Sequence, residues 1–124
     1  MNMDDEIYTQ NILDRYRRPK NKRTMENFDA REAGVNPSCG DSLVLFLKFD
    51  EMGSIEDASF DGEGCAISQA SADMLMGKVH GMRREEAKRI TKEDVCGMLG
   101  ISVGPAREKC ALLAWGALQS ALAK

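Results

Sequence analysis

Apolar and polar residues alternate most regularly in the middle of the chain, where they predict a β-hairpin. Every second residue is apolar in the run Leu43, Leu45, Leu47 and Phe49, the spacing that brings side chains to one face of a strand. Residues 55–60 form the returning strand after an Asp-Glu-Met-Gly turn at 50–53, a composition that favours tight reversals. A weaker pattern over residues 30–35 predicts a further short strand before the Asn36-Pro37 turn. We therefore expect a small antiparallel sheet.

The other apolar positions recur at helical spacing. Pro19 ends the first helix, Gly77 marks the end of the second, Thr91 is an N-cap, and Pro105 opens the last helix. The predicted helices cover residues 4–18, 66–76, 84–90, 92–100 and 105–122.

Length and composition indicate one soluble domain. The 124 residues, 43% apolar and 30% charged, are enough for one core and too few for two. A net charge of −3 argues against a general nucleic-acid binder, and no segment approaches the about 20 apolar residues of a membrane span. The acidic start, residues 1–6, has no apolar run typical of a secretory signal. We expect a single domain over 1–124 in the cytoplasm.

Basic residues cluster at one place in the sequence. Six of the nine residues from Arg15 to Arg23 are Lys or Arg. Such a run either docks an acidic partner or simply forms a solvated helix end and loop.

Four cysteines stand at positions 39, 65, 96 and 110, without a Cys-x-x-Cys pair. The expected compartment favours reduced thiols over two disulfides. Cys39 precedes the first strand of the hairpin and Cys65 follows the second, so antiparallel pairing brings both to the same end of the sheet.

Cys65 occupies the most reactive setting that the sequence predicts. Glycines at 62 and 64 allow positive φ and leave the sulfur without flanking side chains. The position lies where a strand gives way to a helix, whose positive end favours a thiolate. We expect Cys65 to be a nucleophile or a metal ligand.

Cys39 and Asp41 flank Gly40, where a bend can turn both side chains toward one metal. With Cys65 and Cys110 they give three thiolates and one carboxylate, the number that tetrahedral zinc or a small iron-sulfur cluster requires. From spacing alone, each cysteine could instead be a small buried apolar side chain. Cys96, beside apolar neighbours, is expected to have that role.

Three segments carry these residues in order. They are Asn36-Pro37-Ser38-Cys39-Gly40-Asp41, Gly62-Glu63-Gly64-Cys65-Ala66-Ile67-Ser68 and Lys109-Cys110-Ala111-Leu112-Leu113-Ala114-Trp115. They resemble the cysteine motifs of the U-type iron-sulfur cluster assembly scaffolds, the family of IscU, SufU and the N-terminal domain of NifU. Residues 8–21 resemble that family's first helix. The resemblance spans nearly the whole chain and implies an α+β fold, with a small antiparallel β-sheet of about three strands packed against several helices and the site at one end.

The resemblance also implies a function. Cys39, Asp41, Cys65 and Cys110 would hold a [2Fe-2S] cluster, or zinc in its absence. A cysteine desulfurase would deliver sulfur as a persulfide onto one of the thiols, and the cluster would pass to apo iron-sulfur proteins. We expect Cys110 to be that acceptor, because it lies near the start of a predicted helix, whose positive end favours a thiolate. A cluster held by one chain and a cluster shared by a homodimer are both compatible with the sequence.

The chain departs from each branch of that family. Lys109 stands where the IscU branch has histidine, and residues 102–106 replace that branch's Leu-Pro-Pro-Val-Lys chaperone motif. The interval from Cys65 to Cys110 leaves no room for the insertion that SufU-type members usually carry. We therefore expect a cluster scaffold first and a zinc-dependent sulfurtransferase second, with a purely structural zinc domain as the third alternative.

Overall fold

The computed structural model describes residues 3–38, 40–100 and 104–123. None of the described helices is long and apolar enough to cross a membrane. The elements follow in the order α1 (Met3–Arg17), β1 (Ala30–Asn36), β2 (Asp41–Phe49), β3 (Ile55–Glu63), α2 (Ala66–Val79), α3 (Arg84–Lys88), α4 (Lys92–Leu99) and α5 (Pro105–Leu122).

The three strands form one antiparallel sheet in the order β1-β2-β3. The predicted hairpin is confirmed, and the weakly indicated first strand pairs along the whole of β1. Asn36, the last residue of β1, lies opposite Asp41, the first residue of β2. The end of β1 and the start of β2 therefore meet at one corner of the sheet, where β3 also ends.

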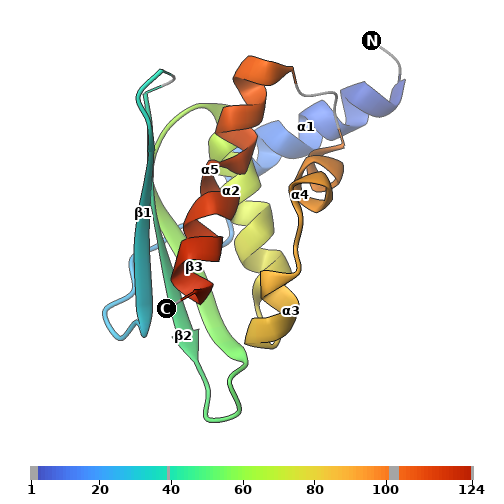
Figure 1. Cartoon of the computed structure of the whole chain (residues 1–124). Helices are drawn as coiled ribbons and strands as arrows, with labels where there is room; N and C mark the ends of the chain where they lie inside the picture. Colours follow the sequence, from blue (N-terminus) through green and yellow to red (C-terminus); the bar gives the residue numbers. More distant parts are fainter. Residues whose placement is uncertain (1–2, 39, 101–103, 124) are drawn as a thin grey trace.

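Helices α2 and α5 lie between the sheet and the outer helices α1, α3 and α4 (Figure 1). This arrangement confirms the predicted α+β fold. The alternate residues of β2 turn their side chains into the core, because period-two spacing places them all on the helix-facing side. The fully buried large side chains are Phe60, Leu43, Leu45, Leu47, Ile55, Leu75, Met76, Leu99, Leu118, Leu122, Val79 and Val95. Each contributes about 1.5–3 kcal/mol through burial.

Helix α2 is longer than the sequence predicts. Gly77 was expected to end it, but the helix continues to Val79 with His80 as its C-cap. A Cβ added at Gly77 would lie 3.3 Å from Asn21 Nδ2, so the glycine makes room for the segment that follows α1. The prediction of the end at Gly77 was wrong because this glycine serves packing rather than termination.

A buried carboxylate fixes the segment after α1. Asp73, fully buried on α2, accepts hydrogen bonds from Arg15 Nη1 at 2.9 Å and from the backbone N–H groups of Lys20 at 2.9 Å and Asn21 at 2.7 Å. Buried carboxylates are tolerated when their oxygens are bonded in this way. Asp73 thus holds the end of α1 and the following turn against α2.

We expect Asp73→Ala to lower the free energy of unfolding by about 3 kcal/mol, because two backbone N–H groups and Arg15 lose their charged acceptor. Urea denaturation followed by circular dichroism measures the loss. Asp14→Ala is the control, since Asp14 is exposed on α1 and should change stability by less than about 0.5 kcal/mol. Equal losses in the two variants would contradict the role given to Asp73.

Candidate metal centre

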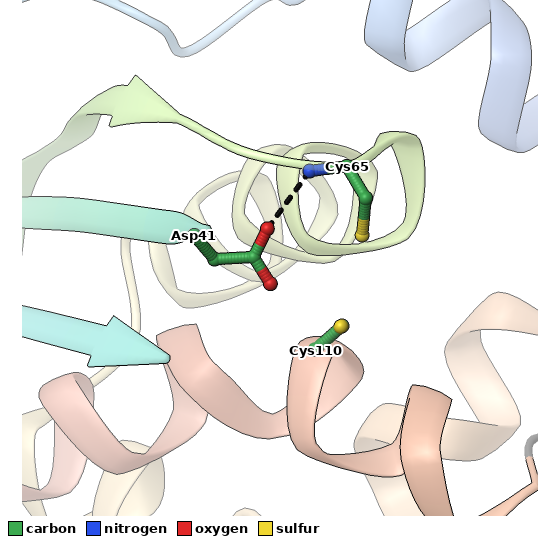
Figure 2. Close-up of side chains that lie close together, drawn as sticks. All are labelled: Asp41, Cys65 and Cys110. Carbon is green, nitrogen blue, oxygen red and sulfur yellow. Dashed lines mark hydrogen bonds between the residues drawn. The ribbon is translucent and has the colours of Figure 1, made fainter. Parts of the chain in front are cut away.

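Asp41 enters the site from the corner of the sheet. The preceding Gly40 has φ of 70°, a left-handed conformation that favours glycine, so the predicted bend at this residue is confirmed. Asp41 is 1% exposed. Its side chain points toward the start of α2 and toward α5 (Figure 2).

Cys65 is the N-cap of α2, as the predicted strand-to-helix junction required. The thiol is exposed, and its Sγ accepts a hydrogen bond from the Ser68 N–H at 3.5 Å. Gly62 has φ of 132°, whereas Gly64 does not adopt positive φ. The prediction of conformational freedom was therefore wrong for Gly64. That glycine is required by space, because a Cβ there would lie 2.6 Å from Ser68 Oγ and collide with the Asp41 carboxylate.

Cys110 lies early in α5 and is 4% exposed. Asn36 Nδ2 donates to its Sγ at 3.9 Å, a long contact of the kind that sulfur acceptors make. Sequence reasoning did not assign Asn36 to the site. Its place opposite Asp41 in the β1–β2 register was the available signal, since that register brings the amide to the same corner.

Asp41, Cys65 and Cys110 converge, although 24 and 45 residues separate them in turn. One carboxylate oxygen and both sulfurs lie within 4.8 Å of one another, and the three side chains point toward a common space (Figure 2). Asp41 Oδ1 accepts a hydrogen bond from the Cys65 N–H at 2.9 Å. The carboxylate thus fixes the position of the loop that carries one of the thiols.

The second carboxylate oxygen is the strongest sign of a bound cation. Asp41 Oδ2 is buried and has no hydrogen-bond partner among the described residues. Leaving a buried charged oxygen without a partner is costly. A metal held by this oxygen and the two thiolates would remove that cost, and the donor set suits zinc or iron. The residues present therefore fit a metal ion.

The other two cysteines of the chain are Cys39 and Cys96. Cys39 lies outside the described residues, so its predicted part in the site stays a prediction. Cys96 lies half-buried on α4 and is not one of the three converging residues. Burial raises the pKa of the Cys96 thiol, and the carboxylates of Glu108 and Glu93 raise that pKa further, which makes it a poor nucleophile.

In the metal-free protein, the difference in exposure between Cys65 and Cys110 should appear as a difference in alkylation rate. We expect iodoacetamide to alkylate Cys65 at least about tenfold faster than Cys110, because reaction requires an accessible sulfur. Peptide mass spectrometry over a time course gives the rate at each cysteine. In urea the two rates should converge. Faster labelling of Cys110 in the folded protein would contradict the described site.

A three-stranded antiparallel sheet covered on one face by helices, with thiols and a buried carboxylate gathered at its corner, defines a small α+β protein with a candidate metal site. Residues 7–124 match the family described as NifU-like N terminal domain, and the chain belongs to that family.

The chain is similar both to a protein named SufU and to a protein named IscU. It is 36% identical to the zinc-dependent sulfurtransferase SufU of Bacillus subtilis, over 97% of this chain and 92% of that protein. It is also 36% identical to the iron-sulfur cluster assembly scaffold protein IscU of Thermotoga maritima, over 95% of this chain and 94% of that protein. The crystal structure of FiSufU from Fervidobacterium islandicum AW-1 superposes with a TM-score of 0.81 at 32% identity, covering 94% of this chain and 97% of that one.

Proposed function

We propose that the protein is a scaffold on which a [2Fe-2S] cluster is assembled and from which it is passed to apo iron-sulfur proteins in the cytoplasm. The observation that carries this proposal is the buried Asp41 Oδ2, which has no hydrogen-bond partner among the described residues, on a carboxylate that lies beside two thiols. Iron and sulfide are cargo of such a scaffold. A cysteine desulfurase would supply the sulfur.

The proposed ligands are Asp41, Cys65 and Cys110, with Cys39 as the fourth. Three thiolates hold cluster iron firmly, whereas a carboxylate is a harder donor that binds iron less strongly. Asp41 is therefore the ligand that releases first. This mixed set suits a site from which the cluster must leave.

Cys110 is the proposed persulfide acceptor. Its thiolate would attack the outer sulfur of the desulfurase persulfide; the donor S–S bond breaks, the donor cysteine leaves as a thiolate, and the new S–S bond forms on Cys110. The buried Cys110 Sγ must be uncovered for this step. The residues of α5 just before it, Arg107, Glu108 and Lys109, are exposed, so a shift of one helix end would suffice.

A zinc-dependent sulfurtransferase is the second candidate, and the tightness of the site favours it. Two sulfur ligands of one tetrahedral zinc lie about 3.8 Å apart, given Zn–S bonds of about 2.3 Å. Three donor atoms that all lie within 4.8 Å of one another suit a single ion, whereas ligands of two different irons stand further apart. In this alternative, the same residues would hold zinc until sulfur is transferred to Cys110.

Anaerobic incubation with ferrous iron, cysteine and a cysteine desulfurase separates the two functions. A scaffold should gain visible absorption and about two irons and two sulfides per [2Fe-2S] cluster. It should then transfer them to an apo-ferredoxin. A sulfurtransferase should instead keep one zinc and accelerate desulfurase turnover. If the protein neither forms a cluster nor accelerates desulfurase turnover, both proposals are refuted.

A further inference from the structure

A groove separate from the cysteines runs between the end of α1, the turn after it, α2 and α4. Its volume is about 1060 Å³. The residues that line it are Asn11, Asp14, Arg15, Arg17, Arg18, Lys20, Asn21, Met74, Gly77, Lys78 and Met98. The groove is lined by much of the basic run from Arg15 to Arg23, to which the proposed function assigns no role.

The rim of the groove is strongly basic. Arg17, Arg18, Lys20 and Lys78 are all exposed. Asp14 is the only acidic side chain among the lining residues that the structure describes. Within the described part of the chain, the Arg17 and Arg18 side chains make no ion pair. These cations lie close together on a protein whose net charge is −3. They therefore produce a local positive potential on a chain that is negative as a whole.

The groove also has apolar surface and a fixed wall. Met74 and Met98 are half-buried along it, and methionine adapts well to apolar side chains of a partner. Gly77 leaves the groove open beside them. The wall formed by Lys20 and Asn21 is held by their hydrogen bonds to Asp73, so binding does not have to order this segment.

We propose that this groove docks an acidic, amphipathic segment of a partner protein. Carboxylates of the segment would meet the basic rim, and its apolar side chains would lie on the two methionines. The acidic remainder of the chain disfavours the long phosphate backbone of a nucleic acid. Met74 lies nine residues after Cys65, about 14 Å along α2, so this part of the groove lies away from Cys65.

Fluorescence anisotropy with a labelled amphipathic peptide of Glu and Leu tests this proposal. We expect binding at about 50 mM salt that weakens strongly at about 300 mM, because salt screens exposed charges. Arg17→Glu with Arg18→Glu should weaken binding at least about tenfold. Lys88→Glu with Arg89→Glu is the matched control, since both residues are exposed on or beside α3 and outside the groove. It should leave the affinity within about twofold.

Methionine-methyl NMR locates the peptide. Signals of Met74 and Met98 should shift on titration, while Met52, 80% exposed on the β2–β3 turn, should not. The proposal is overturned by any of four results: no binding at low salt, equal weakening in both double variants, tighter binding of single-stranded DNA, or a homodimer that only the groove variant loses. The test uses no metal or sulfur donor, so it is independent of the proposed scaffold function.

Discussion

Cys110→Ser should lower the affinity of the site for zinc at least about 100-fold and prevent stable cluster assembly. Loss of a partner that merely orients a ligand costs about 10- to 100-fold, so loss of a ligand itself should cost more. Serine nearly matches cysteine in size, so the buried position next to Asn36 remains filled. Competition with a chromophoric chelator gives the zinc affinity, and desulfurase-driven reconstitution gives the cluster yield.

Cys96→Ser is the matched control. Cys96 lies outside the converging group, and its thiol has a raised pKa, so we expect zinc affinity and cluster yield to stay within about twofold. Mass spectrometry after desulfurase treatment should find the extra sulfur on wild-type Cys110 and not on Cys96. If Cys110→Ser bound zinc as tightly as Cys96→Ser, Cys110 would not be a ligand.

Asp41→Ala should slow cluster transfer to an apo-ferredoxin by roughly tenfold and lengthen the life of the cluster, because the ligand that releases iron most readily is gone. The change also removes the acceptor for the Cys65 N–H. Asp41→Asn separates the two effects, since a neutral amide oxygen still accepts that hydrogen bond but should not replace the carboxylate as an iron ligand. Stopped-flow absorption of the recipient measures the transfer.

Glu63→Ala provides the charge control for Asp41, because Glu63 is an exposed carboxylate near the same corner. It should leave the transfer rate unchanged. Slowing in both Asp41 variants supports the ligand role. If only Asp41→Ala slows transfer, the cause is the lost hydrogen bond to the Cys65 N–H and not a lost ligand. If neither variant changes the transfer rate, Asp41 is not the ligand that releases the cluster.

Much of the site could be predicted because its geometry follows from local rules. The alternation of Leu43, Leu45 and Leu47 predicts a hairpin, and an antiparallel hairpin brings the flanks of its two strands together. Asp41 therefore had to lie near Cys65. The motif around Cys110 placed a third ligand through its resemblance to the family, and the structure brings this residue to the other two.

The parts that could not be predicted depend on contacts between distant segments. Gly77 lies inside α2 because Asn21 approaches it, and Gly64 is small because Ser68 and Asp41 fill the space beside it. Asn36 reaches Cys110 only through the packing of α5 on the sheet. Apart from Ser68, which is four residues from Gly64, these neighbours are distant in sequence, so periodicity and local propensity carry no information about them.

X-ray absorption at the zinc edge of the zinc-loaded protein tests the central claim most directly, because it reports which atoms bind the metal and at what distance. The described site, with Cys39 as its fourth ligand, predicts three sulfurs at about 2.3 Å and one oxygen at about 2.0–2.2 Å. In Asp41→Ala the protein oxygen should be lost while the three sulfurs remain. A shell without sulfur, or one that Asp41→Ala and Cys110→Ser leave unchanged, would contradict convergence of these residues on one metal.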